Sequence, residues 1–401
     1  MRFIYRCGDC GHEFESDDVV YLCPKCGGSE KAGEFRKGIL SVILDPDGLK
    51  ALRDRKDLCV EDFMPYPIVH PETFPCGPTP LVKPLRLRKE TGVDLTLKMD
   101  SQLLSGSFKD RASLLVASQA IHHGQDRIAL ASTGNAGAAM SAIGAAYGLD
   151  IILFVPASAP VNKLMQSVLY GAHVVPVKGT YDDAFALSIA YSRLRGGINR
   201  NTAYNPMTIE GKKAASIEIF LQMGRKAPDV IYVPTGDGCI LGGIWKGFAD
   251  LRDAGLIDRL PRIICCQSTA SSAIADAVDS GRMKDVVATT LADSISVSSP
   301  ANGRMAVRAV KESGGHAVRV SDEEILAAQR ILTAKAGLFV EPASACAYAA
   351  FLKDRDNIQD GESATVLLTG TGFKDMAVFN GRISLPEAIE ASEEAVGRLS
   401  F

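Results

Sequence analysis

From residue 93 onward, the chain alternates short apolar runs, rich in β-branched residues, with longer helical runs. Most of the short runs are apolar at consecutive positions, as in strands that are buried on both faces. Such strands occur in parallel sheets that helices cover on both sides, so the alternation predicts an α/β fold with mostly parallel sheets. The predicted strands span residues 94–98, 128–131, 151–155, 174–177, 230–233, 263–266 and 365–368.

One of the helical runs carries its own start signal. Ser321 is followed three residues later by Glu324 and then by an apolar-periodic stretch, which predicts a capping box. In parallel sheets of this type, ligands bind at the carboxyl ends of the strands. The turns from strand to helix are therefore where functional residues are expected.

Length and composition limit the class of protein. A chain of 401 residues fits two lobes with an appendage, and 46% apolar with 23% charged residues is typical of a soluble globular protein. The net charge of −3 gives no electrostatic reason to expect a nucleic-acid partner. The sequence has no apolar run of membrane-spanning length and its first residues do not resemble a signal peptide, so no membrane partner is expected. The ten cysteines show the usage of a reducing compartment, which predicts a cytoplasmic location.

Four cysteines near the N-terminus form two CxxC pairs, Cys7 with Cys10 and Cys23 with Cys26, separated by twelve residues. Two such pairs suit tetrahedral Zn²⁺ in a segment too small to fold on a core alone. His12 is an alternative fourth ligand, and the other interpretation is that one pair is metal-free or redox-active. Acidic neighbours argue against a nucleic-acid-binding ribbon, so we predict a structural zinc ribbon over residues 1–30.

The run SGSFKDR at residues 105–111 places Lys109 in a tight Gly/Ser loop, directly after Phe108 and before a helical run. An amine that its neighbours hold and partly desolvate is reactive near neutral pH, as a Schiff-base lysine requires. A surface lysine at a helix start is the commoner case. Three further loops support the reactive alternative.

The second loop, STGNAG at residues 132–137, follows a predicted strand and precedes a helix of small residues. Its amides and hydroxyls could receive a carboxylate at the helix N-terminus, and Asn135 could donate to a phenolate-like oxygen. The alternative is an N-capped helix with glycines for close packing.

The third loop, PTGDGCILGG at residues 234–243, leads from a strand into a helix and exposes backbone N–H groups suited to a phosphate. It is not a dinucleotide-binding fingerprint, because its third glycine position holds a leucine. The side chain of Asp237 is expected to point away from a phosphate. Cys239 is interpreted as a small residue that fills space.

The fourth loop, TGTGFKD at residues 369–375, follows the last predicted strand. Thr369 at the strand's carboxyl end could bond a ring nitrogen without carrying charge, although a polar turn is the alternative. Together the four loops offer an amine for an aldehyde, a donor for a ring oxygen, a phosphate cradle and a hydroxyl for a pyridine nitrogen. Pyridoxal phosphate requires these parts.

With these motifs the chain resembles the threonine synthase family, within the tryptophan-synthase-β-like pyridoxal-phosphate enzymes, over roughly residues 77–376. The matching motifs are residues 77–81 (GPTPL), 105–111, 132–135, 205–206 with 209–211 (NP and IEG), 341–345 (EPASA) and 369–370 with 374–375. Archaeal-type members of the family also carry a small N-terminal cysteine ribbon. The resemblance implies a two-lobed fold with mostly parallel sheets, and a homodimer would be ordinary for the family.

The resemblance also implies roles for single residues. Lys109 would bind the cofactor covalently, Asn135 would contact its O3′, and Thr369 would contact its pyridine nitrogen. The whole cofactor-binding set is Phe108, Lys109, Asn135, Gly236, Asp237, Gly238, Cys239, Ile240 and Thr369. The substrate-binding set is Ser132, Thr133, Gly134, Asn135, Ala136 and Thr208. Glu341 could orient groups near the cofactor or could simply be the carboxylate at a helix start.

The expected division of the chain follows from the same resemblance. A large cofactor-binding lobe would comprise residues 31–111 and 206–401, and a small substrate-binding lobe would comprise residues 112–205. The small lobe carries the STGNAG loop, which would receive the carboxylate of an amino-acid substrate.

The chain departs from the family pattern mainly at positions expected to face the substrate. Residues 103–104 are Leu-Leu where the family usually has Asn-Pro, Ala136 replaces a threonine, and Thr208 replaces an arginine. The segment at residues 295–300 reads ISVSSP where the family usually has IRIGNP. A threonine cannot replace an arginine as a bidentate phosphate clamp.

The leading functional prediction is a lyase that converts O-phosphohomoserine and water into threonine and phosphate. The second alternative keeps the cofactor but performs β-replacement or β-elimination on a phosphoserine-, serine- or cysteine-type substrate, as cysteate synthases and dehydratases do. A third alternative is a non-enzymatic zinc-ribbon binding protein on a degenerate scaffold. The broken glycine pattern of residues 234–243 disfavours a nicotinamide dehydrogenase.

Overall fold

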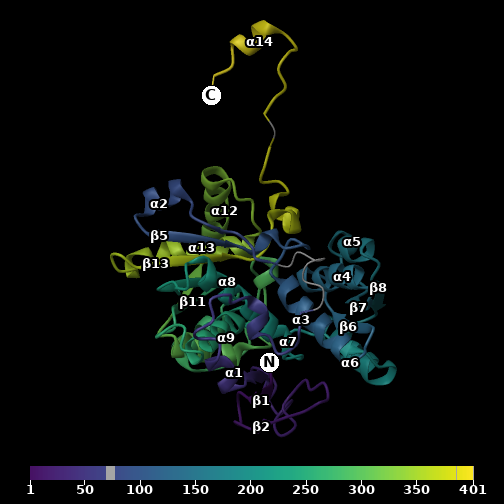
Figure 1. The fold of residues 1–401 in the computed structure, drawn as a ribbon. Coiled ribbons are helices and arrows are strands. Elements are labelled where there is room, and N and C mark those ends of the chain that lie inside the picture. The colour runs from purple at the N-terminus through teal and green to yellow at the C-terminus, as the bar shows by residue number, and fades with distance from the viewer. Residues whose placement is uncertain (69–76, 385, 401) are drawn as a thin grey trace.

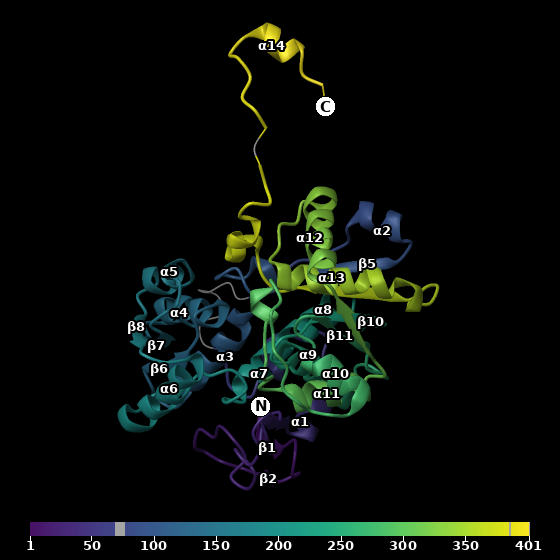
Figure 2. The same ribbon diagram turned by 180° about the vertical axis from the view of Figure 1, so that it is seen from behind.

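The structure of the chain is a computed structural model that describes residues 1–68, 77–384 and 386–400. Two lobes lie side by side, and a small N-terminal unit lies beneath them in Figure 1. The C-terminal segment, which includes the short helix α14 (Glu393–Gly397), extends away from the lobes (Figures 1 and 2). The described residues form helix-covered, mostly parallel sheets, which confirms the predicted fold class.

The larger lobe is built on a six-stranded sheet in the order β12-β11-β10-β13-β5-β4. Neighbouring strands are parallel except β4, which runs antiparallel to β5. The strands are β4 (Leu81–Val82), β5 (Asp94–Met99), β10 (Val230–Pro234), β11 (Arg262–Ser268), β12 (Ala317–Val320) and β13 (Ser363–Leu368).

Helices cover both faces of this sheet (Figures 1 and 2). The strand β10 shows the consequence: Ile231 and Val233 pack into one apolar core, and Val230 and Tyr232 pack into another. A strand with two covered faces has no polar side, which explains why this run is apolar at each position.

The helices outside the smaller lobe are α1 (Pro46–Lys50), α2 (Leu85–Thr91), α7 (Met207–Glu210), α8 (Ala214–Gln222), α9 (Cys239–Asp253), α10 (Ala273–Ser280), α11 (Gly303–Glu312), α12 (Asp322–Ala336) and α13 (Pro342–Asp354). Short 3₁₀ helices are η1 (Val60–Phe63), η2 (Asp100–Gln102), η3 (Gly211–Lys213), η4 (Asp293–Ile295), η5 (Arg355–Asn357) and η6 (Gly372–Phe379). The predicted capping box is confirmed, since Ser321 Oγ accepts from Glu324 N at 3.2 Å and Ser321 N donates to Glu324 Oε2 at 2.6 Å.

The smaller lobe contains a four-stranded parallel sheet in the order β8-β7-β6-β9. Its strands are β6 (Arg127–Ala131), β7 (Asp150–Pro156), β8 (His173–Val177) and β9 (Ile198–Asn199). Its helices are α3 (Lys109–His122), α4 (Asn135–Tyr147), α5 (Val161–Leu169) and α6 (Tyr181–Arg195).

Every strand predicted from the sequence is present. Within the two lobes, the prediction missed β4 and β9, which are two residues long, and β12, whose buried positions alternate with partly exposed ones that include Arg319. Short edge strands of this kind lack the continuous apolar run that marks a central parallel strand.

The N-terminal unit contains an antiparallel sheet in the order β2-β1-β3, formed by β1 (Phe3–Cys7), β2 (Glu13–Phe14) and β3 (Leu40–Leu44). The sheet thus continues past residue 30 into β3. The unit contacts both lobes: Arg308 Nη2 donates to Gly8 O at 2.5 Å, and Asn199 N donates to Tyr21 OH at 2.9 Å. None of the helices in the described ranges has the length and apolar character needed to cross a membrane.

A buried network of charges lies beneath the Lys109 loop. Arg111 Nε donates to Asp100 Oδ2 at 2.8 Å, and Arg111 Nη1 donates to Glu218 Oε1 at 2.6 Å. Lys98 Nζ binds the other oxygen of Glu218 at 2.6 Å. The side chains of these four residues are at most 4% exposed, so each charge depends on its partners in place of water.

Candidate active site

A cavity of about 750 Å³ lies where the two lobes meet. Residues from all four loops that the sequence singled out line it, among them Lys109, Asn135, Asp237 and Thr369. The loops come together because each follows, or lies against, the carboxyl end of a parallel strand. The cavity is therefore the candidate active site.

Lys109 is the first residue of α3, and its loop is fixed against the loop that contains Thr369. The amide of Phe108 donates to Thr369 O at 2.7 Å, and Ser107 pairs with Gly370. Within the described ranges, the Lys109 amine has no hydrogen-bond or ion-pair partner, although its side chain lines the cavity. Burial lowers the pKa of Lys109, while Glu341 and Asp237 act in the opposite direction. The amine is thus free to react.

Asp110 stabilises the loop before Lys109 through two hydrogen bonds with Ser105. Its carboxylate accepts from Ser105 N at 2.7 Å and from Ser105 Oγ at 2.5 Å. Burial raises the pKa of Asp110 to about 6, although both contacts with Ser105 lower it. Gly106 lies inside the closed loop with φ +81°, a conformation that residues with a Cβ rarely adopt.

In the loop at residues 132–137, the Ser132 side chain binds backbone amides at the N-terminus of α4. Ser132 Oγ accepts from Gly134 N at 3.3 Å and from Gly137 N at 3.0 Å. The amides of Asn135 and Ala136 have no hydrogen-bond partner among the described residues. Thr133 and Gly134 also line the cavity, so this helix N-terminus presents free donors to it.

The loop at residues 234–243 presents a longer row of free donors. The backbone N–H groups of residues 236–241 have no hydrogen-bond partner within the described ranges. Gly238 has φ +81°, and a Cβ there would lie 2.9 Å from Asn302 O. Asp237 Oδ1 accepts from Ala301 N at 3.3 Å, so the carboxylate is engaged by a neighbouring loop. Burial raises the pKa of the Cys239 thiol to about 12, which keeps it neutral.

Thr369 lies at the carboxyl end of β13 and is 5% exposed. Its hydroxyl is 3.2 Å from Ser344 Oγ and 3.4 Å from Glu341 Oε1. Ser344 Oγ also accepts from Thr369 N at 2.8 Å and from Gly370 N at 2.9 Å, which fixes the turn. A neutral hydroxyl is therefore held at the wall of the cavity.

Glu341 belongs to the site although the sequence left its role open. It precedes α13 but makes no side-chain cap there. Its carboxylate instead accepts from Asn135 Nδ2 at 3.0 Å and from Ser294 Oγ at 3.1 Å. Burial raises the pKa of Glu341, and the contact with Asn135 lowers it.

Thr208 is placed differently from the other predicted substrate-binding residues. Its side chain is fully buried, and it is not among the residues that line the cavity. Its hydroxyl donates to Asn205 O at 2.7 Å and accepts from Ala203 N at 3.0 Å. This position therefore stabilises a turn.

Sequence reasoning missed two cations that line the cavity, Lys212 and Arg36. Lys212 follows the predicted IEG motif, and Arg36 follows the cysteine pairs. No local signal distinguishes either residue from a surface cation, because the sequence does not show that both segments fold back onto the cavity.

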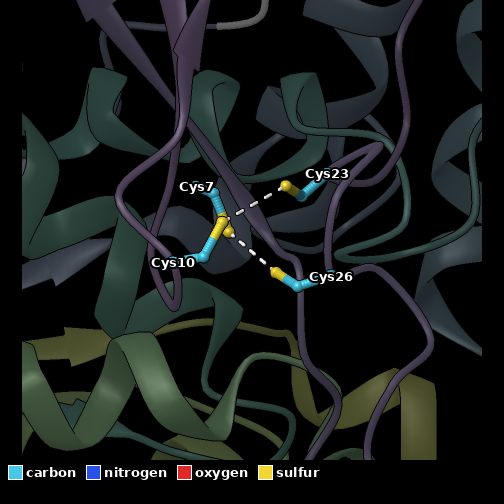
Figure 3. A group of neighbouring side chains, drawn as sticks. All are labelled: Cys7, Cys10, Cys23 and Cys26. Atoms are coloured by element: carbon cyan, nitrogen blue, oxygen red, sulfur yellow. Dashed lines mark hydrogen bonds between the residues drawn. The ribbon is translucent and has the colours of Figure 1, made fainter.

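The four N-terminal cysteines meet in a separate cluster (Figure 3). Cys7 Sγ lies 3.4 Å from Cys26 Sγ, Cys10 Sγ lies 3.6 Å from Cys23 Sγ, and all four sulfurs lie within 4.8 Å of one another. Four thiolates around one Zn²⁺, with Zn–S bonds of about 2.3 Å, would be separated by roughly 3.8 Å, so the cluster fits such an ion. His12 is outside this cluster and stacks on Phe14.

Comparison with known proteins gives the class of the enzyme. A model of the family described as "Pyridoxal-phosphate dependent enzyme" matches residues 73–370. A threonine deaminase from Solanum lycopersicum shares the fold, with a TM-score of 0.67 at 19% identity over 92% of this chain and 96% of that structure. Fold, site and family model together define a pyridoxal-phosphate-dependent enzyme.

Two curated relatives identify the family within this class of enzymes. The threonine synthase of Methanosarcina acetivorans is 33% identical over 408 residues, which cover 99% of this chain and 98% of the relative. The threonine synthase of Methanocaldococcus jannaschii is 34% identical over 414 residues, which cover 98% and 96% of the two chains. The chain belongs to the threonine synthase family of pyridoxal-phosphate-dependent lyases.

The donor set of the cavity fits pyridoxal phosphate. An unpartnered amine at Lys109 suits its aldehyde, and the unpaired amides of residues 236–241 suit its phosphate. The Asn135 side-chain amide and the Thr369 hydroxyl, which both contact Glu341 in this structure, line the cavity and are suited to hydrogen-bond ring substituents of the cofactor. When bound, the cofactor supplies an electron sink for negative charge that develops next to the substrate amino group.

Proposed function

We propose that this chain is a threonine synthase that converts O-phosphohomoserine and water into threonine and phosphate. The observation that carries the proposal is the unpartnered amine of Lys109 at the meeting point of four polar loops in the cavity. Near full-length similarity to two threonine synthases supports the choice of reaction.

The proposed roles follow the geometry of the cavity. Lys109 binds the cofactor, with Phe108 packed behind it, and Asn135 and Thr369 contact the ring. Gly236, Asp237, Gly238, Cys239 and Ile240 surround the cofactor phosphate with backbone N–H groups. The substrate carboxylate binds at the loop Ser132, Thr133, Gly134, Asn135 and Ala136, where free amides face the cavity.

Lys109 also moves protons in this proposal. With the cofactor and an amino-acid substrate bound, the Lys109 amine would face the substrate from the wall of the cavity. Burial lowers the pKa of Lys109, so the amine can accept a proton from one carbon and return it to the next. The nearby Glu341 carboxylate counters that effect and keeps the amine from becoming too weak a base.

The other features of the chain complete the proposal. The four N-terminal cysteines bind a structural Zn²⁺ in a ribbon assigned to residues 1–30, which stabilises the base of both lobes. Residues 112–205 form the substrate-binding lobe, and residues 31–111 and 206–401 form the cofactor-binding lobe. We propose a cytoplasmic homodimer that acts on a small amino-acid substrate without a nucleic-acid or membrane partner.

A second candidate function has one specific observation in its favour. Thr208 replaces the arginine of the family pattern, and its hydroxyl is used entirely within its own turn. A substrate with a shorter side chain, such as O-phosphoserine, would need a different arrangement of phosphate ligands. β-Replacement or β-elimination on such a substrate is therefore the alternative.

The test is phosphate release by the purified protein loaded with pyridoxal phosphate. We expect turnover with O-phosphohomoserine and formation of threonine, with little turnover of O-phosphoserine. The Lys109→Ala variant should lose both the visible absorbance of the bound cofactor and the activity. Turnover confined to O-phosphoserine would replace the proposal by the second candidate, and retention of the visible band in Lys109→Ala would overturn the placement of the cofactor.

A further inference from the structure

Lys212 lies in η3, directly against the helix that begins at the cavity. Its side chain is fully buried and lines the cavity. A Cβ added to Gly243, in the second turn of α9, would lie 2.5 Å from Lys212 Cβ. The lysine thus packs against the second turn of α9, and its ammonium group donates to Thr208 O.

Within the described ranges, the charge of Lys212 has no acidic partner. The neighbouring Lys213 is paired with Glu210 and with Asp250, and Lys98 is paired with Glu218. Among the described residues, no carboxylate lies within ion-pair distance of Lys212. Lys212 therefore differs from Lys98 and Lys213, which are buried and paired with acids.

A second buried cation, Arg200, also has no acidic partner in the part of the chain that the structure describes. Arg200 is fully buried, and its Nε and Nη1 donate to Ser113 Oγ at 3.3 Å and to Thr202 Oγ1 at 2.9 Å. Its Nη2 is buried without a hydrogen-bond partner in the described part of the chain. Burial lowers the pKa of Arg200 to about 10. Burial, together with the positive charge of Arg200, lowers the pKa of Lys212 to about 7.

Two buried cations without an anion are costly to maintain in a folded protein. Lys212 packs against α9, and the amides of residues 236–241 at the start of that helix are also unpaired within the described ranges. Arg200 donates to Thr202, which lines the same cavity. One anionic group at the start of α9 would supply a partner both for the buried cations and for the unpaired amides. A phosphate dianion accepts from backbone amides and pairs with a lysine ammonium group.

We propose that Lys212 forms an ion pair with the phosphate of the cofactor at the N-terminus of α9, and that Arg200 supplies a second positive charge behind it. The proposal rests on the placement of the cofactor given under the proposed function. The packing of Lys212 against the second turn of α9 favours the cofactor phosphate over the phosphate of a substrate, because that turn directly follows the row of free amides at residues 236–241.

The test compares pyridoxal phosphate with pyridoxal, which lacks the phosphate. Apoprotein of wild type, Lys212→Met and Lys212→Arg is titrated with each compound, and binding is followed by the visible absorbance. We expect the Kd of pyridoxal phosphate to rise about 10- to 100-fold in Lys212→Met, as for the loss of a charge-assisted hydrogen bond. The Kd of pyridoxal should change less than about twofold, and Lys212→Arg should restore most of the affinity for pyridoxal phosphate.

The thermal stability of the apoprotein is the second measurement. Removal of a buried unpaired charge should leave the melting temperature of the Lys212→Met apoprotein unchanged or raised, while the stabilisation by pyridoxal phosphate should shrink. Lys335→Gln, which alters a partly exposed lysine paired with Glu90, is the control and should behave as wild type.

Three results would overturn the inference. They are an equal loss of affinity for both compounds in Lys212→Met, unchanged affinity for both, or weakened binding of a phosphorylated substrate alone. The Lys109→Ala variant separates this inference from the proposal on which it rests. If Lys109→Ala abolishes the visible band while Lys212→Met binds pyridoxal phosphate normally, only the role of Lys212 is wrong; if Lys109→Ala keeps the band, the placement of the cofactor and the role of Lys212 are both wrong.

Discussion

Asn135 Nδ2 lies 3.0 Å from Glu341 Oε2, so the first residue of α4 in one lobe is joined to the residue before α13 in the other. The same amide group donates to Ser294 Oγ at 3.2 Å. Both donor hydrogens of Asn135 are thus used in this structure. A ring oxygen that binds Asn135 has to take over one of these contacts, which couples cofactor binding to the position of Glu341.

Replacement of Glu341 by Gln should change the pH dependence of Lys109. The carboxylate raises the pKa of Lys109 against the effect of burial, so its removal should lower that pKa. An amine must lose its proton before it attacks an aldehyde. The rate at which apoprotein captures pyridoxal should therefore reach its half-maximum at a lower pH in Glu341→Gln than in wild type.

Stopped-flow absorbance across a pH series measures this rate. Glu323→Gln, which changes an exposed glutamate at the start of α12, is the control and should leave the profile in place. A profile that moves to higher pH in Glu341→Gln would contradict the electrostatic role assigned to the carboxylate.

Arg111→Met should destabilise the protein strongly. The substitution removes the cation that Asp100 and Glu218 share, which leaves buried Asp100 without its ion-pair partner and Glu218 with Lys98 alone. Breaking a buried ion pair on one side costs about 3–5 kcal/mol. Urea unfolding of the apoprotein measures the loss.

Arg86→Met is the matched control for this change. Arg86 forms an ion pair with Glu90, but its side chain is 62% exposed. Its replacement should alter the free energy of unfolding by less than about 0.5 kcal/mol. Equal losses in the two variants would show that the buried network is no more important than a surface pair.

The stability of the protein should fall in acid because of Glu218. Burial alone would raise its pKa, but Arg111 and Lys98 lower it from 4.5 to about 2. A depressed pKa contributes stability that is complete above the unfolded value and is lost as the pH falls through the folded one. Between pH 5 and pH 2 this residue should account for about 3 kcal/mol of the lost stability.

The comparison of wild type with Glu218→Gln isolates that contribution. The variant should be less stable at pH 7, and its free energy of unfolding should fall less steeply from pH 5 to pH 2. Parallel pH profiles for the two proteins would refute the assignment.

Gly238→Ala should weaken cofactor binding. Gly238 has φ +81°, and a Cβ there would lie 2.8 Å from Ala306 Cβ and 2.9 Å from Asn302 O. The loop would have to shift, and its amides would no longer converge on one phosphate. We expect at least a roughly tenfold increase in the Kd of pyridoxal phosphate, the equivalent of losing one charge-assisted hydrogen bond.

Gly281→Ala separates backbone strain from the loss of space. Gly281 has φ +73°, but a Cβ there would have no atom within 4 Å. Both variants should lose about 1 kcal/mol from the left-handed backbone conformation. Only Gly238→Ala should lose affinity for the cofactor, and an equal effect of Gly281→Ala would mean that the clash is irrelevant.

Removal of metal from the cysteine cluster should destabilise the base of the molecule. We expect one zinc per chain by elemental analysis and a melting temperature lower by about 5 °C or more after chelation or in Cys10→Ser. Cys59→Ser is the control, because Cys59 is exposed and lies outside the cluster. A protein without metal whose melting temperature does not respond to chelators would rule out a structural zinc.

The parallel strands could be predicted well because a strand that is buried on both faces is apolar at consecutive positions. The run at residues 230–233 is apolar throughout since its side chains enter two cores. The four polar loops could also be predicted to meet, because carboxyl ends of parallel strands share an edge. A strand such as β12, with only two buried positions, has no continuous apolar run.

Several residues of the site could not be predicted from local patterns. Lys212 and Lys213 are adjacent and chemically identical, yet Lys213 pairs with two acids while Lys212 lines the cavity without one. Which of the two lysines is paired and which lines the cavity depends on how η3 packs against α9. Likewise, Thr208 occupies the motif position of a substrate ligand but points into its own turn.

The N-terminal unit binds Asn199 through Tyr21 and Arg308 through Gly8, so it is attached to both lobes on the side where it lies (Figure 2). Any motion that separates the lobes there has to stretch those two bonds. We therefore expect any relative rotation of the lobes to occur about an axis through this unit. Loss of these two contacts would allow the lobes to shift relative to each other. Residues that lie on opposite sides of the cavity would then be misaligned, even with none of them substituted.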